Sequence, residues 1–453
     1  MKNRTVKFID LFAGLGGIRL GFENVFQRVG FKTKCVMTSE IKPHSVVALN
    51  ENFEHDYFVG DIFKVDTKSI PDFDFLLGGF PCQPFSAAGN RQGFVDTRGT
   101  LFFEVERILR AKRPYGFILE NVEGLVKHDL VNKGDEIGIT LATILYKLHD
   151  DLGYEVSWKV YDSVEFGLPQ SRKRIFIVGT KSHAIDLNGV QPKFKPLKSI
   201  LDKGLNTIDS DFVTKLLSHF KLKDLYGKSI KDKRGGANNI HSWDIGLKGD
   251  VSREQSFMLD SLLKDRRKKE WAKVIGIDWM DGMPLTLQQI NTFINCSEDQ
   301  LRLMLEDLTQ KGYLRFEHPK KLVKESVNGR VKSFRIYDET KPKGYNIVTG
   351  KLSFEINKIL DPNKIAPTLV ATDVSRLAVA DGEGLRRLTI REGLRLFGYP
   401  ERYVISTNEG DAFDLLGNTV AVPVVEFVAA KLAQVYSNSE VDHLTISEIP
   451  VCS

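Results

Sequence analysis

Cys82 lies on a loop that follows a short apolar run, and its thiol is the most reactive nucleophile type in this part of the chain. The run from Phe75 to Leu77 predicts a buried strand, two glycines end it, and Pro81 and Pro84 stiffen the turn around the thiol. In open α/β sheets, ligands bind outside the carboxyl ends of the strands. A lone cysteine is more often a small buried hydrophobe, so the rest of the chain must support a chemical role.

Acidic residues follow other predicted strands in the same way. Because the carboxyl ends of parallel strands meet at one edge of a sheet, we expect these carboxylates near Cys82. Glu40 is spaced like the acid that binds ribose hydroxyls in nucleotide-binding folds. The strands and their acids are Cys35 to Ser39 with Glu40, Tyr57 to Val59 with Asp61, and Tyr115 to Leu119 with Glu120.

Two arginines precede the apolar strand from Ile175 to Val178. Strand alternation places Arg172 and Arg174 on the same face. A free cysteine has a pKa of about 8.5, so a nucleophilic thiol needs cations of this kind to ionise near neutral pH.

The chain begins with a strand, a glycine turn and a helix. Val6 to Leu11 predicts the strand, and the turn from Phe12 to Gly17 exposes backbone N–H groups at the start of an amphipathic helix. This pattern is typical of a nucleotide-type site. The turn lacks the GxGxxG fingerprint, so it does not indicate NAD.

Composition predicts a two-domain enzyme of the cytoplasm. The 453 residues are 42% apolar and 27% charged, and we expect no run long enough to span a membrane. Four separated cysteines indicate neither a metal site nor a disulfide framework. Residues 181–360 hold 33 Lys and Arg against 23 Asp and Glu, which predicts a polyanion partner for this segment.

Six motifs occur in a characteristic order over residues 1–180 and 385–435. They are FIDLFAGLGG, GGFPCQPFS, DTRGTLFF, ENVEGL, QSRKRIFIVG and GNTVAVP. This set resembles the DNA (cytosine-5)-methyltransferases of bacterial restriction-modification systems. The resemblance implies a Rossmann-like S-adenosylmethionine-dependent methyltransferase fold of class α/β, with a mixed, mostly parallel sheet and helices on both faces. The expected domains are a catalytic domain 1–185, an α+β target-recognition domain 186–375, and a segment 376–453 that completes the catalytic domain.

The resemblance also implies a mechanism. The thiolate of Cys82 would add to carbon 6 of a cytosine and make carbon 5 nucleophilic, and Glu120 would hydrogen-bond or protonate the ring at N3. Arg172 and Arg174 would hold the nucleotide's phosphate and base carbonyl. The methyl group would come from S-adenosylmethionine, and a base that the sequence does not identify would remove the carbon 5 proton.

The cofactor pocket follows from the same resemblance. Phe12 would stack on the adenine, Glu40 would bind the ribose, and Asp61 would accept from the adenine amino group. Ile41 departs from the family pattern, because relatives often have an aromatic residue there. The predicted cofactor residues are Phe12, Gly14, Gly16, Glu40, Ile41, Asp61, Ile62, Pro81, Leu101, Asn418 and Thr419.

A duplex hides the reacting carbon, so the target base must rotate out of the helix. The expected partners are duplex DNA with a specific short sequence and, functionally, a cognate restriction endonuclease, and we expect a monomer. The predicted DNA-contacting residues are Gln83, Ser86, Arg98, Gln170, Arg234 and Asn238.

The middle segment also suggests a winged helix-turn-helix. Residues 286–294 and 301–310 predict two short helices, the second with a capping box at residues 297–300, and Asn328-Gly329 predicts a β-hairpin. The second helix carries mostly acidic residues, which makes it a poor reader of a DNA groove. Wing contacts or packing against protein are therefore alternatives to base readout by this helix.

Two other functions use the same motifs. A tRNA cytosine-5 methyltransferase could have the same scaffold, although the basic middle segment favours duplex DNA. A catalytically silent DNA-binding relative is the second alternative, and intact Cys82, Glu120, Arg172 and Arg174 argue against it.

Overall fold

The computed structural model describes residues 4–80, 101–327, 330–349, 354–370 and 374–447. The chain forms two compact units. We expected a boundary at residue 186, but Ile185 and Leu187 still pack into the core of the first unit. Unit 1 comprises Met1–Asp202, Pro362–Ser375 and Leu388–Ser453, and unit 2 comprises Lys203–Asp361 and Arg376–Arg387.

Unit 1 contains a sheet of seven strands among the described residues, in the order β3-β2-β1-β4-β5-β7-β6. In this sheet β7 alone runs opposite to the other six strands, so the sheet is mostly parallel, as predicted. The carboxyl ends of β1 to β5 therefore share one edge. The strands are β1 (Thr5–Leu11), β2 (Lys32–Ser39), β3 (Phe58–Val59), β4 (Phe75–Gly79), β5 (Gly116–Val122), β6 (Glu155–Asp162) and β7 (Lys173–Thr180).

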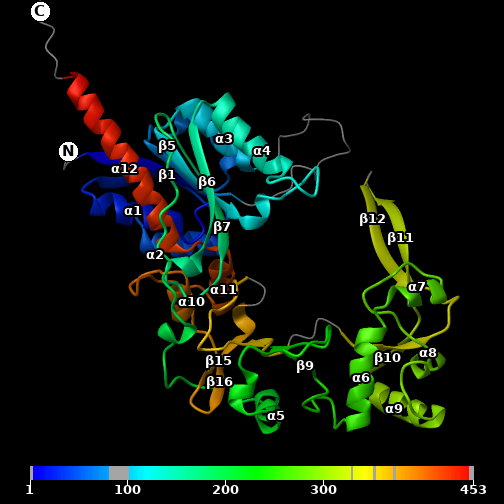
Figure 1. The fold of residues 1–453 in the computed structure, drawn as a ribbon. Helices are drawn as coiled ribbons and strands as arrows, with labels where there is room; N and C mark the ends of the chain where they lie inside the picture. The colour runs from blue at the N-terminus through cyan, green and yellow to red at the C-terminus, as the bar shows by residue number, and fades with distance from the viewer. Residues whose placement is uncertain (1–3, 81–100, 328–329, 350–353, 371–373, 448–453) are drawn as a thin grey trace, which may run out of the picture. The chain divides into compact units, whose positions relative to one another are not determined.

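Helices cover both faces of this sheet (Figure 1). On one face, α1 (Gly17–Arg28) and α12 (Val422–Ser447) bury apolar side chains against β1 and β4. On the other face, α3 (Leu101–Lys112) and α4 (Ile139–Tyr146) do the same. The remaining helices of unit 1 are α2 (Pro43–Asn52), α10 (Ile390–Leu396) and α11 (Glu409–Asn418).

The helix pair α1 and α12 joins the two ends of the chain. Gly21 of α1 has no side chain, and a Cβ built there would lie 2.8 Å from Cβ of Val425 on α12. The glycine thus lets the helices approach closely, and the C-terminal segment becomes part of the core built by the first strand. The helix α12 extends to Ser447.

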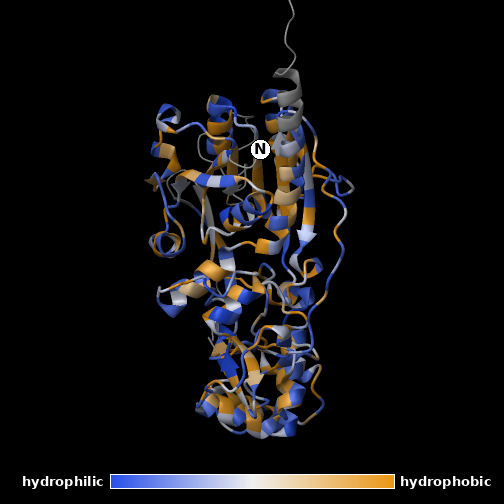
Figure 2. Ribbon diagram, turned by 90° about the vertical axis from the view of Figure 1, so that its left-hand side faces the viewer, coloured by the Kyte–Doolittle hydropathy of each residue, from blue (hydrophilic) through white to orange (hydrophobic). Residues whose placement is uncertain are grey.

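One helical stretch, Glu409–Asn438, is long and apolar enough to span a membrane by length and composition, contrary to our expectation. However, 67% of its apolar window is buried inside the structure. Figure 2 shows apolar residues along α12, and Val424, Val428 and Leu432 pack in the core of unit 1. Its hydropathy is that of a core helix.

Unit 2 has two apolar clusters. The first surrounds a small sheet in the order β16-β15-β14-β8-β9 and includes residues of α5 (Asp211–His219). Pairing of β15 with β14 places residues 376–387 in this unit. The strands are β8 (Ser229–Ile230), β9 (Asn239–Ile240), β14 (Lys358–Ile359), β15 (Leu377–Asp381) and β16 (Gly384–Arg387).

The second cluster is mainly helical. It unites α6, α8 and α9 with the antiparallel pair β10 and β13, while β11 and β12 form a separate hairpin whose connection is residues 328–329. This is the element order expected of the suggested winged helix-turn-helix, and Ser297 and Gln300 form the predicted capping box. The elements are α6 (Arg253–Asp265), α7 (Lys269–Ile275), α8 (Leu287–Asn291), α9 (Glu298–Gln310), β10 (Leu314–Glu317), β11 (Lys320–Val327), β12 (Arg330–Tyr337) and β13 (Gly344–Ile347).

Candidate active site

A cavity of about 1190 Å³ lies at the carboxyl ends of β1 to β5 in unit 1. Segments from both ends of the chain line it, because residues that follow α10 return beside the first strands. It brings together most of the predicted cofactor residues and three of the four predicted catalytic residues. These are Phe12, Gly14, Glu40, Ile41, Asp61, Ile62, Leu101 and Asn418, together with Glu120, Arg172 and Arg174.

Glu40 organises the glycine turn. Its Oε2 accepts a hydrogen bond from the Gly14 N–H at 2.8 Å, and its Oε1 accepts from the N–H groups of Ile41 and Lys42, also at 2.8 Å. A carboxylate offers about four acceptor positions, so Glu40 keeps one for a hydroxyl donor in the cavity.

Phe12, the first residue of this turn, and Asp61 both line the cavity. Phe12 has a φ of 56°, a conformation that L residues seldom adopt and that often marks functional sites. Asp61 caps a short helical turn by accepting from the Phe63 N–H at 3.1 Å, and it also lines the cavity. Ile41 is 70% exposed and lines the cavity, so it offers an apolar surface there.

Glu120 stands at the end of β5 beside the end of β4. Its Oε1 lies 3.0 Å from Nε of Arg174 on the neighbouring β7. Burial raises the pKa of Glu120, and the opposing charges of Arg174 and Arg172 only partly offset this rise. The carboxyl group therefore keeps its proton to a higher pH than a surface glutamate.

Arg172 ties three chain segments together. Its Nη1 donates to the Leu369 carbonyl at 3.0 Å and its Nη2 to the Gly417 carbonyl at 3.1 Å. Its guanidinium lies 5.2 Å from the centre of the Phe397 ring. Burial, and secondarily the charge of Arg174, lowers the pKa of Arg172 to about 9. The same arginine thus lines the cavity and fixes the returning C-terminal segment there.

Asn121 connects β5 to the segment that carries the predicted nucleophile. Its Nδ2 donates to the Phe80 carbonyl at 2.8 Å, and Phe80 is the last residue described before the gap. Cys82, Pro81, Gln83, Ser86 and Arg98 lie outside the described residues.

Three predicted residues have other roles. Gln170 is completely buried, and its amide donates to the Leu396 carbonyl and accepts from the Leu369 N–H, so it is not free to contact DNA as predicted. The Thr419 hydroxyl pairs with that of Tyr399 at 2.5 Å, away from the cavity lining. Gly16, with φ 65°, forms the N-cap of α1 rather than the cavity wall.

The sequence interpretation missed several lining residues. Asn121 was quoted only as part of the ENVEGL motif. Its position next to the predicted catalytic residue Glu120 could have indicated that it also lines the cavity. Ser39 joins β2 to β3 by donating to the Gly60 carbonyl at 3.1 Å. Leu415 and Gly417 come from the C-terminal segment, and the GNTVAVP motif, which begins at Gly417, was the available signal for them.

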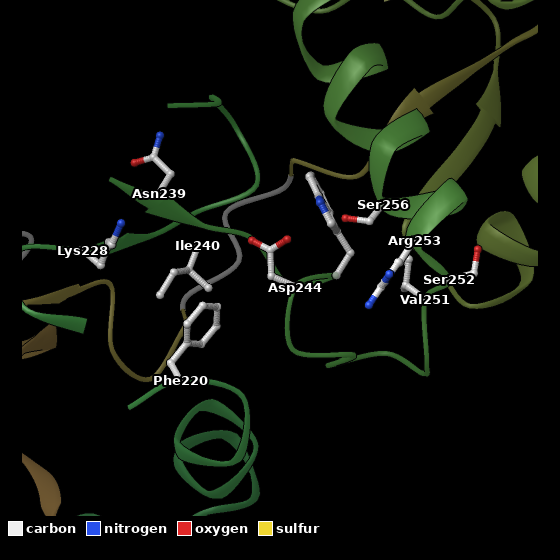
Figure 3. A pocket seen from close by; sticks show the side chains of 10 residues that line it. Phe220, Lys228, Asn239, Ile240, Asp244, Val251, Ser252, Arg253 and Ser256 are labelled. Atoms are coloured by element: carbon white, nitrogen blue, oxygen red, sulfur yellow. The ribbon is translucent and has the colours of Figure 1, made fainter. Parts of the chain in front are cut away.

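Unit 2 holds Arg234 and Asn238, whose side chains are exposed on the loop between β8 and β9. A smaller cavity of about 420 Å³ lies at the foot of this loop. Figure 3 shows the Asp244 carboxylate between the β9 side chains and Ser256 of α6. Burial raises the pKa of Asp244. This cavity contains none of the predicted cofactor or catalytic residues.

Comparison with known proteins decides the family. The family model of the C-5 cytosine-specific DNA methylases matches residues 6–434. This chain belongs to that family. It is 56% identical over 429 residues to each of two type II methyltransferases, M.NlaIV of Neisseria lactamica and M.NgoBV of Neisseria gonorrhoeae, covering 95% of this chain and 99% of each relative. A prophage-encoded DNA modification methyltransferase of E. coli shares the fold with a TM-score of 0.51 at 20% identity, covering 95% of this chain and 99% of that one.

The C-5 cytosine-specific DNA methylase therefore transfers a methyl group from S-adenosylmethionine to carbon 5 of cytosine in DNA. The residues of the cavity suit this cofactor. Phe12, Ile41 and Ile62 offer apolar surface for an adenine, and Glu40 and Asp61 offer carboxylate acceptors for hydroxyl and amino groups. The backbone N–H of Gly14 is already held by Glu40, so the turn is fixed without a ligand.

Proposed function

We propose that the enzyme methylates a cytosine flipped out of a specific short duplex sequence, through a transient bond between Cys82 Sγ and carbon 6 of the base. The observation that carries this proposal is the meeting of Glu120, Arg174 and Asn121 in the cofactor cavity. Asn121 holds the Phe80 carbonyl, and two further residues of chain span at most about 7 Å. This short connection supports the proposal that Cys82 acts at that site.

The proposed steps balance without a further reactant. The Cys82 thiolate gives its electron pair to carbon 6, and the π electrons of the ring move towards carbon 5. Glu120, whose pKa is raised by burial, supplies a hydrogen bond or proton at N3 and stabilises this charge. S-adenosylmethionine, when bound, would supply the methyl group: carbon 5 would take it with its electron pair, and the sulfur would leave as the neutral thioether of S-adenosylhomocysteine. A base then takes the carbon 5 proton, the electron pair restores the ring double bond, and the thiolate leaves.

The arginines position the base in this proposal. Arg174 holds the Glu120 carboxyl group in place, and Arg172 presents the part of its guanidinium that the carbonyls of Leu369 and Gly417 leave free. Phe12, Glu40 and Asp61 bind the adenosyl part of the cofactor, with Leu101 and Asn418 closing the pocket.

Unit 2 selects the DNA sequence in this proposal. Arg234 and Asn238 are residue types that bind guanine and adenine through two hydrogen bonds in the major groove. The start of their loop is held in place, because the buried Asp232 accepts hydrogen bonds from the Ser242 N–H at 2.8 Å and from the Ser242 hydroxyl at 2.7 Å. A loop whose tip is exposed and whose ends are held in place is well suited to contact the edges of nucleotide bases.

The type II names of the relatives place this enzyme with the restriction-modification methyltransferases. We further infer that it acts as a monomer on cytoplasmic DNA and protects that DNA from a cognate endonuclease. The composition of the chain and its basic middle segment support this setting.

Covalent trapping tests the mechanism. Fluorine at carbon 5 cannot leave as a proton does, so duplex DNA containing 5-fluorocytosine should stay bonded to the parent enzyme in the presence of cofactor. Cys82→Ala should give no adduct. Cys35→Ala is the matched control and should trap normally, because Cys35 is buried and burial raises the pKa of its thiol to about 12.

Transfer assays separate the alternatives. Duplex DNA should accept labelled methyl groups, and transfer RNA should not. Absence of any adduct with the parent enzyme, or an adduct with Cys82→Ala, would contradict the proposed nucleophile, and methylation of transfer RNA alone would contradict the substrate.

A further inference from the structure

Three segments of unit 2 that are distant in sequence form one surface. Asp281 links the first two, because its Oδ1 lies 2.6 Å from Nε of Arg267 and its Oδ2 lies 3.8 Å from Nη2 of Arg234. Arg234 belongs to the loop 231–238, and Arg267 follows α6. The loop and the segment 266–281 are therefore neighbours in space.

The hairpin β11–β12 joins the same surface. Arg335 of β12 donates to the Trp279 carbonyl at 2.8 Å, and the Trp279 indole N–H donates to the Arg267 carbonyl at 2.9 Å. The Trp279 side chain remains 42% exposed. We call the loop 231–238, the segment 266–281 and the strands β11 and β12 together the three-segment surface.

Positive charge dominates this surface. The described side chains of the two hairpin strands include four Lys and Arg, at positions 320, 321, 324 and 335, and one Glu, at position 325. Arg267, Lys268 and Lys269 add three cations after α6, whereas Arg266 beside them is buried. Lys324 is exposed and has no ion-pair partner among the side chains that the structure describes. Lys321 is also exposed, and its only described ionic neighbour is Asp338 at 3.7 Å. Exposed pairs of this kind contribute little and exchange readily for a phosphate.

The helix α9 has the opposite charge. It carries four acidic residues and one basic residue, Arg302, which already pairs with Glu298 at 2.9 Å. In a helix-turn-helix, the second helix usually enters the major groove. Here phosphates would repel that helix, whereas the hairpin that follows it would attract them.

We propose that the three-segment surface is the DNA-binding face of unit 2, and that the β11–β12 hairpin, rather than α9, holds the phosphate backbone beside the recognition sequence. The inference rests on the proposed role of unit 2 in DNA selection. The hairpin anchors the duplex without reading it, and the adjoining loop with Arg234 and Asn238 contacts base edges. Contacts through Asp281, Trp279 and Arg335 place the hairpin and the loop side by side on this surface.

The double variant Lys321→Gln/Lys324→Gln tests this assignment. Loss of two phosphate contacts should reduce the slope of log affinity against log salt by about 1.8, since each contact contributes about 0.9. At a given salt concentration, the affinity for a duplex with the recognition sequence and the affinity for an unrelated duplex should fall by the same factor. The rate at saturating DNA should stay at the parent value, because neither lysine lies in the cofactor cavity.

Arg302→Gln on α9 is the control, since it also removes an exposed cation from unit 2, but from the helix rather than from the hairpin. Its salt slope should equal that of the parent. An unchanged slope in the lysine variant, an equal loss in the control, or a loss confined to the methylated sequence would each overturn the proposal.

Trp279→Phe gives an independent readout. DNA should change the tryptophan fluorescence of the parent enzyme, and most of that change should disappear in this variant. A persistent change would place the duplex elsewhere. These results differ from a failure of the proposed function, in which the parent enzyme would transfer no methyl group to any duplex.

Discussion

Glu120 experiences two opposing influences, and their balance sets its chemistry. Burial favours the neutral acid, whereas Arg174 at 3.0 Å favours the carboxylate, and the net result is a raised pKa. A group that retains its proton can donate it to a ring nitrogen. We expect Glu120→Gln to lower kcat by about 10²- to 10⁴-fold, the usual range for loss of a general acid.

The pH profile gives a sharper check on Glu120. In the parent enzyme, activity should decline as pH rises through the Glu120 pKa, and the glutamine variant should lack this decline. Glu123→Gln is the control. Glu123 is close to Glu120 in the sequence, but its side chain is exposed and its described ion pair, with Lys173, is a loose one of 3.7 Å. Cofactor affinity, measured by calorimetry, should be the same in all three proteins. If the activity of Glu120→Gln still declined at alkaline pH, the decline would belong to another titrating group.

Asp10 makes stability depend on pH. It is a buried residue of β1, its Oδ2 has no hydrogen-bond partner among the described residues, and burial raises its pKa from 3.8 to about 7. Between these values the unfolded chain loses the proton and the folded chain keeps it, so the free energy of unfolding falls as pH rises, by about 4 kcal/mol in total. Urea unfolding should show about 3 kcal/mol of this loss between pH 5 and pH 8.

Asp10→Asn should remove this part of the pH dependence. Both proteins share all other titrating groups, so the difference between their two profiles isolates Asp10. Parallel profiles would show that the carboxyl group is ionised in the folded protein.

Sequence reasoning identified the residues that follow strands and missed those whose role depends on distant partners. Glu40, Asp61 and Glu120 line the cavity because parallel strands end at one edge. Gln170 was expected at the DNA, yet main-chain groups about 200 residues away occupy its amide. Hydrogen bonds across such a separation leave no periodic signal in the sequence.

At the scale of elements, the contact between α1 and α12 leaves no room for a side chain at Gly21. Gly21→Ala would place a methyl group 2.8 Å from the Val425 side chain and 3.2 Å from the Glu426 nitrogen. We expect a loss of about 1–3 kcal/mol in the free energy of unfolding, the usual cost of overpacking a core. Gly410→Ala in α11 is the control, because that glycine is exposed and alanine favours helices by up to about 1 kcal/mol. Equal stabilisation of both variants would show that the helices can move apart.

Element prediction succeeded where a pattern is local. The hairpin at residues 328–329 and the capping box at Ser297 depend on neighbouring residues, and both are present. The predicted domain boundary was wrong for residues 376–387. They were assigned to the catalytic domain, but they belong to unit 2, because β15 pairs with β14 of the middle segment. A two-residue strand such as β14 has too few residues to show alternation.

At the scale of the whole molecule, the two units should unfold separately, because each has its own apolar core. The core of unit 1 depends on both chain ends, since residues 420–436 cover the face of β1 and β4. Every described core residue of unit 2 precedes residue 388. A chain that ends at Arg387 should therefore lose unit 1 and keep unit 2. Calorimetry should show two transitions for the full chain and one for the truncated chain.

The truncated chain should also lose S-adenosylmethionine binding, because Leu415, Gly417 and Asn418 line the cavity and the Gly417 carbonyl holds Arg172. Its remaining transition should occur at the temperature of one of the two parental transitions, since the unit 2 clusters keep all their residues. Retention of cofactor binding, or a single transition in the full chain, would show that the units depend on each other in a way their separate cores do not require. The return of the chain to its first strand would then contribute packing alone, and the cavity would be complete without it.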